Sequence, residues 1–387
     1  MSHDFLVLGA SGMQGRIVCR DLLEADYSVC LADLHPEQAD AVGQRYGGSR
    51  YRVLETDLRD HNQIVAAIYG SGADVVINCA EGDWNLLVYK ACLEVGVHCI
   101  DLGSDIPMTK DQLALSEKFR QARLTAITGC GSTPGINNIM LYYAVTNEFD
   151  TVDTVEAGFA WDSNIKKFVV PFSIESIIEE FTEPAPVLYG GMWEERTPLQ
   201  HTTVRTYRDI GKQMSFPVRH PETYTFYRYY QKRGLQNVLF YAGFPDHSRL
   251  AIENYIESGL GDKVPRKING IQMRPIDFLV TILRDLPYPD GYTEIENLWV
   301  EISGLRHGKP KQVLMECLVS TLPTWEDAGC NIDTGIPASI IAQMIKNNEI
   351  TTRGSFAPGP VVPYDFFFDK LRQRQMRIYK NGVPVTA

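Results

Sequence analysis

The first residues that could do chemistry form a glycine-rich turn near the start of the chain. Gly9, Gly12 and Gly15 follow the apolar run 5–8 with the spacing G-x-x-G-x-x-G, and a segment with an apolar stripe begins directly after them. In a strand–turn–helix unit of this kind, backbone N–H groups at the helix N-terminus bind the pyrophosphate of a dinucleotide. In this turn we expect cofactor contacts from Gly9, Ser11, Gly12, Met13 and Gln14.

An acidic residue, Asp33, ends the second apolar run of the chain. In dinucleotide-binding proteins, a carboxylate at a similar distance in sequence from the glycine turn binds the adenosine ribose. A carboxylate there repels a 2′-phosphate and Leu34 follows it, so the sequence favours NAD over NADP. His35, or an arginine distant in sequence, could reverse that preference. Asp57, after the third run, either accepts a bond from the adenine or caps the next helix.

Polar and small residues also follow the later apolar runs, at 78–85, 101–104 and 129–135. In an open α/β sheet, ligands bind outside the carboxyl ends of the strands, so these three loops should surround the reacting carbon. We therefore expect Cys79, Ala80 and Gly103 to contact the cofactor. We expect Trp84 and Cys130 to contact the substrate.

Asp101 is the best candidate in these loops for moving a proton. Oxidation of an amine to an imine requires an uncharged amine, so a nearby group must take the proton. The alternative for Asp101 is a structural carboxylate bonded to loop N–H groups. Cys130 could be a nucleophile, but the sequence places no histidine beside it, which favours packing.

The elements that must position these residues follow from the apolar pattern. The first third alternates strands and helices, which predicts an α/β fold, a Rossmann doubly wound parallel sheet. Its predicted strands are 5–8, 29–32, 51–55, 74–79, 98–101 and 125–127. Its predicted helices include 36–46, 61–68 and 84–95.

After residue 135 the pattern changes to half-buried strands. The segment 152–159 alternates apolar and polar residues, and 298–303 and 313–320 flank a turn at His307, which predicts an antiparallel hairpin. Helices are predicted over 337–345, with a proline near the start, and 364–373. We expect a Rossmann NAD-binding domain at 1–130, an α+β substrate and dimerisation domain with a mixed or antiparallel sheet at 131–335, and a C-terminal segment, 336–387, that returns to the Rossmann domain.

Composition narrows the class of protein. The chain has 387 residues, a formal net charge of −11 and 44% hydrophobic residues. An acidic surface disfavours nucleic acid and anionic membranes as partners. The 8 cysteines form no C-x-x-C pair and the 8 histidines are scattered, so we expect no metal site and reduced thiols in a cytoplasmic protein. We expect a small-molecule substrate, a homodimer and no signal peptide.

Several of these motifs together resemble the saccharopine dehydrogenase-like family. They are the glycine turn with Asp33, the run 96–103 (GVHCIDLG), and Gly131-x-x-Pro134-Gly135. The resemblance covers nearly the whole chain, and its middle and tail look closest to the L-lysine 6-dehydrogenase branch. It implies an NAD-dependent oxidoreductase that acts on the CH–NH or CH–NH₂ group of an amino acid. The best match is oxidation of the lysine ε-amine to 2-aminoadipate semialdehyde, and the alternative is a saccharopine or carboxynorspermidine dehydrogenase.

Three positions depart from the family pattern: Gly129, the run 357–359 and Ala242. An arginine is expected at the last of these, so an anchor for a substrate carboxylate is missing. Arg228 lies among aromatic residues, and we predict that it replaces that arginine. The departures also leave open a protein of another class, a non-catalytic NAD sensor.

Overall fold

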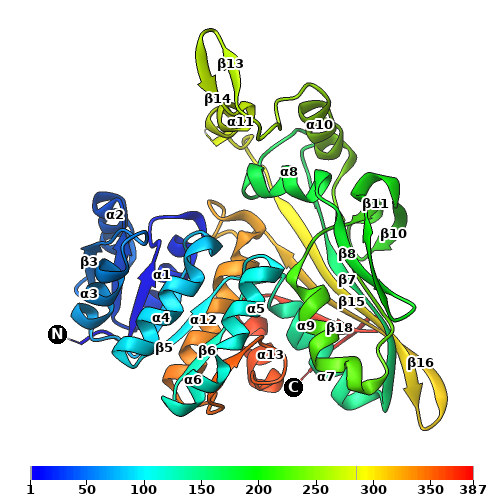
Figure 1. Ribbon diagram of the computed structural model, residues 1–387, viewed down its shortest axis with the longest axis horizontal. Helices are drawn as coiled ribbons and strands as arrows, with labels where there is room; N and C mark the ends of the chain where they lie inside the picture. The colour runs from blue at the N-terminus through cyan, green and yellow to red at the C-terminus, as the bar shows by residue number, and fades with distance from the viewer. Residues whose placement is uncertain (1, 285, 387) are drawn as a thin grey trace.

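The computed structural model describes residues 2–284 and 286–386 and contains two large sheets that lie side by side (Figure 1). The N-terminal sheet has seven strands in the order β17-β6-β5-β4-β1-β2-β3, and its neighbouring strands are parallel. Its strands are β1 Phe5–Leu8, β2 Val29–Asp33, β3 Tyr51–Glu55, β4 Val75–Asn78, β5 His98–Asp101, β6 Thr125–Ile127 and β17 Gly354–Phe356. The Rossmann sheet predicted from the sequence is confirmed, with β17 as an added edge strand.

Helices cover both faces of this sheet, which is why its central strands are apolar throughout. Phe5 and Val7 of β1 pack into one hydrophobic cluster, and Leu6 and Leu8 pack into another on the opposite face. The covering helices are α1 Met13–Glu24, α2 Pro36–Tyr46, α3 His61–Ser71, α4 Asn85–Val95, α5 Ile106–Ala114, α6 Ser116–Gln121 and α12 Ile332–Lys346.

Helix α12 begins earlier than the sequence predicted. Pro337 therefore lies inside the helix and not near its start. A proline there removes one helical hydrogen bond. The apolar spacing extends upstream through Ile332 and Ile336, and both side chains are buried. Burial along the whole helix, which packs against α1, offsets the lost bond.

The second sheet is mixed. Its main path is β10-β11-β12-β7-β15-β16-β18-β19, with β8 and β9 attached to β12, and β12 runs parallel to β7. Its strands are β7 Thr151–Ser163, β8 Ala185–Tyr189, β9 Met192–Arg196, β10 Thr203–Tyr207, β11 Gly211–Pro217, β12 Asn237–Gly243, β15 Glu294–Arg306, β16 Lys309–Ser320, β18 Arg377–Lys380 and β19 Val383–Pro384. The predicted hairpin is β15–β16, longer than expected, and its turn has positive φ at His307 and Gly308, as a two-residue turn requires.

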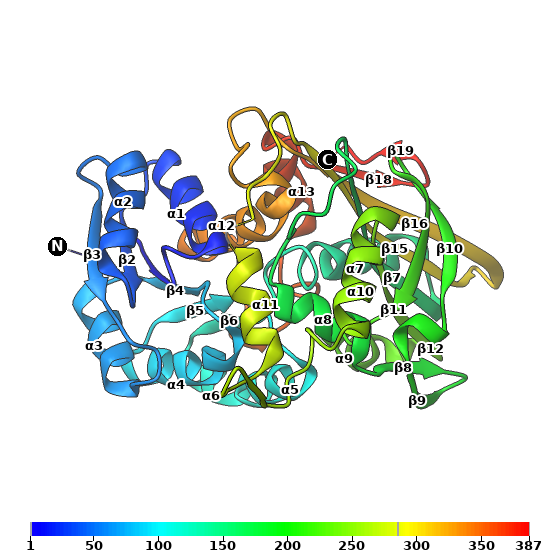
Figure 2. The same ribbon diagram turned by 90° about the horizontal axis from the view of Figure 1, so that it is seen from above.

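The other helices surround this second sheet. They are α7 Ile136–Glu148, α8 Ile174–Thr182, α9 Pro221–Tyr230, α10 Asp246–Glu257, α11 Pro275–Arg284 and α13 Tyr364–Gln373. A small hairpin, β13 Arg266–Ile268 and β14 Ile271–Met273, projects from the body near α11 (Figure 1). Seen from above, α11 lies over the middle of the molecule, between the two sheets (Figure 2).

The C-terminal segment, which we expected to return to the Rossmann domain, joins both sheets. Strand β17 pairs with β6 in the first sheet, but β18 pairs with β16 in the second. One continuous hydrophobic cluster runs from β1 to the second sheet, so the two halves share a core. Within the described residues, no helix combines the length and the apolar character that a membrane span requires.

Candidate active site

The glycine turn has the geometry of a phosphate-binding loop. Gly9 has a φ of +72°, and a Cβ built on it would lie 2.8 Å from the backbone nitrogen of Ala80. A Cβ on Gly15 would lie 2.0 Å from the Gly9 carbonyl oxygen, so both positions require glycine for packing. Gly12 is exposed at the N-cap of α1, and a Cβ there would lie 3.3 Å from the Gly9 carbonyl oxygen, beside the helix N-terminus. These residues fit a dinucleotide pyrophosphate at that point.

Asp33 lies beside this turn and lines a hollow at the carboxyl ends of the strands. Its carboxylate accepts hydrogen bonds from the backbone N–H of Ser11 at 2.8 Å and of His35 at 3.0 Å. The hollow is also lined by Gly9, Leu34, Thr56, Asp57, Leu58, Arg59, Ala80 and Trp84. Its place beside the glycine turn suits an adenosine. Trp84, which we expected to contact the substrate, is among the residues that line this hollow.

The Asp57 carboxylate is bound by the Arg59 side chain in this hollow. The Arg59 guanidinium donates two hydrogen bonds to it from Nε, at 2.9 and 3.0 Å, and lowers the pKa of Asp57 to about 2. Helix α3 is capped by another residue, Asp60, which accepts from the N–H of Asn62 at 2.9 Å. The alternative that Asp57 caps this helix is therefore wrong.

Asp101 is closed off from ligands, which corrects its expected role as an acid or base that contacts substrate. Its side chain is fully buried. Its oxygens accept hydrogen bonds from five donors, namely the hydroxyls of Tyr89 and Thr128, the amide of Gln112, and the backbone N–H groups of Gly103 and Gly129. Burial raises the pKa of Asp101, and most of these donors lower it in part. This carboxylate ties the ends of β5 and β6 together.

Two other expected substrate contacts also lie elsewhere. Cys130 is fully buried, its Sγ points to the Ile127 carbonyl oxygen at 3.4 Å, and burial raises the pKa of its thiol well above the usual value. Arg228 is exposed on α9, where its Nη1 donates to the Tyr224 hydroxyl at 3.2 Å. Cys130 therefore packs in the core, and Arg228 is not among the residues that line the pocket described next.

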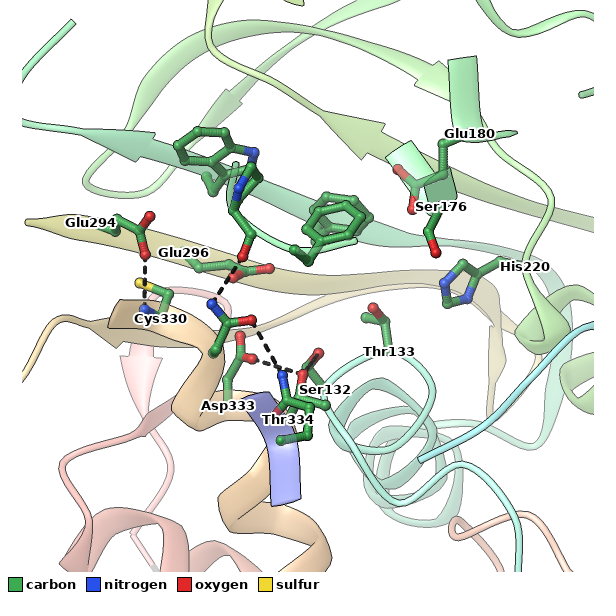
Figure 3. Close-up of a pocket in the computed structure, with 16 residues that line it drawn as sticks. Ser132, Thr133, Ser176, Glu180, His220, Glu294, Glu296, Cys330, Asp333 and Thr334 are labelled. Atoms are coloured by element: carbon green, nitrogen blue, oxygen red, sulfur yellow. Dashed lines mark hydrogen bonds between the residues drawn. The ribbon is translucent and has the colours of Figure 1, made fainter. Parts of the chain in front are cut away.

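A cavity of about 250 Å³ lies where the two halves meet, and we refer to it as the central cavity (Figure 3). It is lined by Gln14, Ser132, Thr133, Phe159, Trp161, Pro171, Phe172, Ser176, Glu180, His220, Glu294, Glu296, Cys330, Asn331, Asp333 and Thr334. Gln14 of the glycine turn donates to the Asn331 side chain at 3.2 Å, so the turn reaches directly into the cavity. The expected cofactor loop and the second sheet thus share one site.

One side of the central cavity is acidic. Glu294, Glu296 and Asp333, which we call the acidic wall, lie together on it (Figure 3). Burial raises the pKa of Glu296 and of Asp333, and the negative charge of Asp333 raises that of Glu296 further. The pair therefore holds a proton at a pH where isolated carboxyls have lost theirs. Oδ2 of Asp333 is buried without a hydrogen-bond partner among the described residues.

The opposite side of the cavity carries hydroxyls and a histidine. Thr133, Ser176 and His220 lie there, with Glu180 beyond Ser176 (Figure 3). Burial raises the pKa of Glu180 to about 8. In the described part of the chain, His220 is the one basic side chain that lines the cavity. The site can therefore hold a cation against one side and a hydrogen-bond acceptor against the other.

Of the residues that line this cavity, the sequence pointed to Gln14 in the glycine turn and to Ser132 and Thr133 in the loop 129–135, and the others were missed. His220 and Glu222 stand in the pattern H-x-E just before and inside the start of α9, and their side chains are bonded through Nδ1 and Oε2. That pattern is a local signal that could have marked them. The acidic wall has no such signal, because its members come from β15 and α12.

Comparison with known proteins agrees with this geometry. The family model described as "Saccharopine dehydrogenase NADP binding domain" matches residues 5–127, and that described as "Saccharopine dehydrogenase C-terminal domain" matches residues 131–376. The chain belongs to the saccharopine dehydrogenase family. The resemblance read from the motifs is confirmed, and the protein is an NAD(P)-dependent amino-acid dehydrogenase of that family.

Relatives in this family include enzymes with polyamine-type names. The chain is 24% identical over 383 residues to a carboxyaminopropylagmatine dehydrogenase from Synechocystis sp., covering 95% of this chain and 94% of that protein. It is 24% identical over 316 residues to a carboxynorspermidine synthase from Vibrio alginolyticus, covering 77% and 75%. These names fit the alternative drawn from the sequence and give no support to lysine 6-dehydrogenase.

A solved structure shares the whole saccharopine dehydrogenase fold. Apo saccharopine dehydrogenase (L-Glu forming) from Saccharomyces cerevisiae superposes with a TM-score of 0.79 at 14% identity, covering 100% of both chains. At that identity the match speaks for the fold alone. The family match supports a nicotinamide dinucleotide as the cofactor, with the choice between NAD and NADP open.

Proposed function

We propose that this dehydrogenase acts on the C–N bond of an amino acid that carries a second, cationic arm, as a carboxylated polyamine or guanidine does. The observation that carries the proposal is the acidic wall, which lies in a cavity that, among the described residues, no lysine or arginine lines. A bound nicotinamide dinucleotide would accept or donate the hydride.

The charge of the acidic wall selects for a cation. Burying an ammonium or guanidinium group is costly unless opposite charge is present, and Glu296 and Asp333 supply it. Binding a cation there displaces the proton that the pair holds. A substrate with several carboxylates would instead bring like charge to these residues, which argues against saccharopine itself.

The far side of the cavity suits the single carboxylate of such a substrate. The hydroxyls of Thr133 and Ser176 can each donate one hydrogen bond. These donors take the place of the arginine that is missing at Ala242, which is fully buried in β12. The substrate would then span the cavity, with its cationic arm on the acidic wall and its carboxylate opposite.

The cofactor would lie along the first sheet. Gly12 leaves room for the pyrophosphate, and the Asp33 carboxylate faces the hollow where the adenosine ribose fits. Asp33 supports NAD because it repels a 2′-phosphate. Arg59 lines the same hollow and is the distant arginine that would accommodate that phosphate in NADP. The expected homodimer is also a proposal, and light scattering after gel filtration tests it.

A reduced-nicotinamide absorbance assay tests the function. The panel holds carboxynorspermidine, carboxyaminopropylagmatine, saccharopine and lysine, each with NAD and with NADP. We expect the highest kcat/KM with one of the two cationic compounds. A higher value with saccharopine or lysine would overturn the proposed substrate class. Cofactor binding without turnover of either cationic compound would also overturn it.

A further inference from the structure

We propose that His220, oriented by Glu222, is the catalytic acid and base for the reacting nitrogen. This inference rests on the proposed amine chemistry, but it concerns residues that the family match does not assign. His220 lines the central cavity beside Thr133 and Ser176 (Figure 3). Its side chain is 13% exposed, so the ring is held by the protein and still open to the cavity.

Two contacts fix the plane of the His220 ring. It stacks on Phe240 of β12 with 4.0 Å between ring centroids and 6° between planes. Its Nδ1 is bonded to Oε2 of Glu222. A ring fixed in this way can present Nε2 in one direction, which proton transfer requires.

Glu222 orients the ring in this proposal. Its side chain is fully buried and its Oε2 is bonded to Nδ1 of His220. In the proposed arrangement the Glu222 carboxylate accepts this bond from an Nδ1–H group. Nε2 is then left with a lone pair. A buried carboxylate also stabilises the imidazolium that forms when Nε2 takes a proton. Glu222 is thus a positioning residue, and His220 is the group that reaches the substrate.

The proton balance of the reaction fits this pair. A substrate ammonium first gives one proton to Nε2, which leaves a lone pair on the nitrogen. That lone pair forms the C=N bond while the C–H electron pair leaves as hydride to a nicotinamide dinucleotide. In the reverse direction Nε2 returns the proton to the nitrogen. The titratable groups described around the ring are Glu222 on α9 and, across the cavity wall, Glu180 on α8.

The test compares His220→Gln with a matched control, His247→Gln. His247 lies in the same half of the chain, edge-on to Trp161, but is not among the cavity-lining residues. With the cationic substrate that the wild type turns over, we expect His220→Gln to lower kcat by about 100- to 10,000-fold with little change in KM. We expect the control to stay near the wild type. A raised KM with kcat unchanged would mean that His220 only binds the carboxylate, and would overturn the proposal.

A second variant, Glu222→Gln, tests the orientation without a change of size. We expect a smaller loss of kcat and a shift of the pH profile of kcat/KM to lower pH, because the imidazolium loses its counter-charge. In the cofactor-free protein, proton NMR should show a downfield Nδ1–H signal that both Glu222→Gln and His220→Gln remove. An unchanged pH profile, or the same signal in Glu222→Gln, would overturn the positioning role.

These measurements separate the two proposals. If the proposed substrate class is wrong, the wild type does not turn over the cationic compounds. The NMR signal still tests the contact between His220 and Glu222 in that case. If the role of His220 is wrong, the wild type turns over and His220→Gln does so at a similar kcat.

Discussion

Glu296 on β15 and Asp333 on α12 bring two carboxyl groups to one wall of the central cavity, from strand and helix that belong to different halves of the molecule. Burial raises the pKa of both, so they share a site that favours a proton or a cation over two free negative charges. This relationship carries the substrate class that we propose, and it can be tested directly.

Asp333→Asn should weaken binding of a cationic substrate. A charge-assisted hydrogen bond contributes about 1.5–3 kcal/mol, so KM should rise roughly 10- to 100-fold, with a smaller change in kcat. Steady-state kinetics with the best cationic substrate measures this. Asp365→Asn removes the same charge from an exposed position on α13 and should change neither constant. Equal KM values for Asp333→Asn and the wild type would contradict the cation site.

The same pair should make stability depend on pH. Because the folded-state pKa values of Glu296 and Asp333 are raised, their contribution is fully present below the usual carboxyl pKa and is lost as pH rises through the raised values. In urea unfolding of the ligand-free wild type, the free energy of unfolding should therefore fall as pH rises from the usual carboxyl pKa to the raised values. In Asp333→Asn the fall should be smaller, and an identical pH dependence would contradict the raised pKa of the pair.

Asp33→Ala should weaken NAD binding by roughly 10- to 100-fold, since it removes a charge-assisted bond of about 1.5–3 kcal/mol, and should narrow the gap to NADP. Calorimetric titration with each cofactor measures both affinities. Arg59→Ala is the matched control on the other side of the hollow, and we expect it to lower NADP affinity alone. Asp33→Ala with wild-type NAD affinity would mean that this carboxylate is not on the ribose.

Substitutions at two glycines of the turn should affect different properties, cofactor binding in one case and stability in the other. Gly12→Val fills the space beside the α1 N-terminus, so we expect lost cofactor binding in a protein that still folds. Gly15→Ala puts a Cβ at 2.0 Å from the Gly9 oxygen and should destabilise the fold, by about 1–3 kcal/mol as overpacking does. Thermal unfolding and cofactor titration of both variants separate these effects. Tight cofactor binding by Gly12→Val would remove the phosphate assignment.

Asp101→Ala should lower the free energy of unfolding. It leaves the buried donors of Tyr89, Gln112, Gly103 and Gly129 without their acceptor, at a cost of about 3–5 kcal/mol in the free energy of unfolding. Asp105→Ala is the control, because it removes only the exposed N-cap bond to Met108 of α5 and should cost about 1 kcal/mol. Wild-type stability in Asp101→Ala would show that this carboxylate does not tie the loops together.

The sequence alone determined the first sheet and its cofactor turn. Local signals were sufficient there, because each strand is a short apolar run and the glycines stand directly between a strand and a helix. The hairpin β15–β16 was also predictable, since His307-Gly308 marks its turn. The edge strand β17 was missed because it is short and its pairing with β6 depends on a segment far along the chain.

Only the tertiary structure decided which residues meet in the central cavity. Asp101 was a reasonable acid–base candidate because it ends a strand. The five hydrogen-bond donors around its carboxylate come from different parts of the chain, so the sequence did not reveal them. Glu296, Asp333 and His220 come from three separate elements, and the packing of the second sheet against α12 brings them to one cavity. Burial then raises the pKa of Glu296 and of Asp333, and burial is a property of the folded core that no local spacing of residues records.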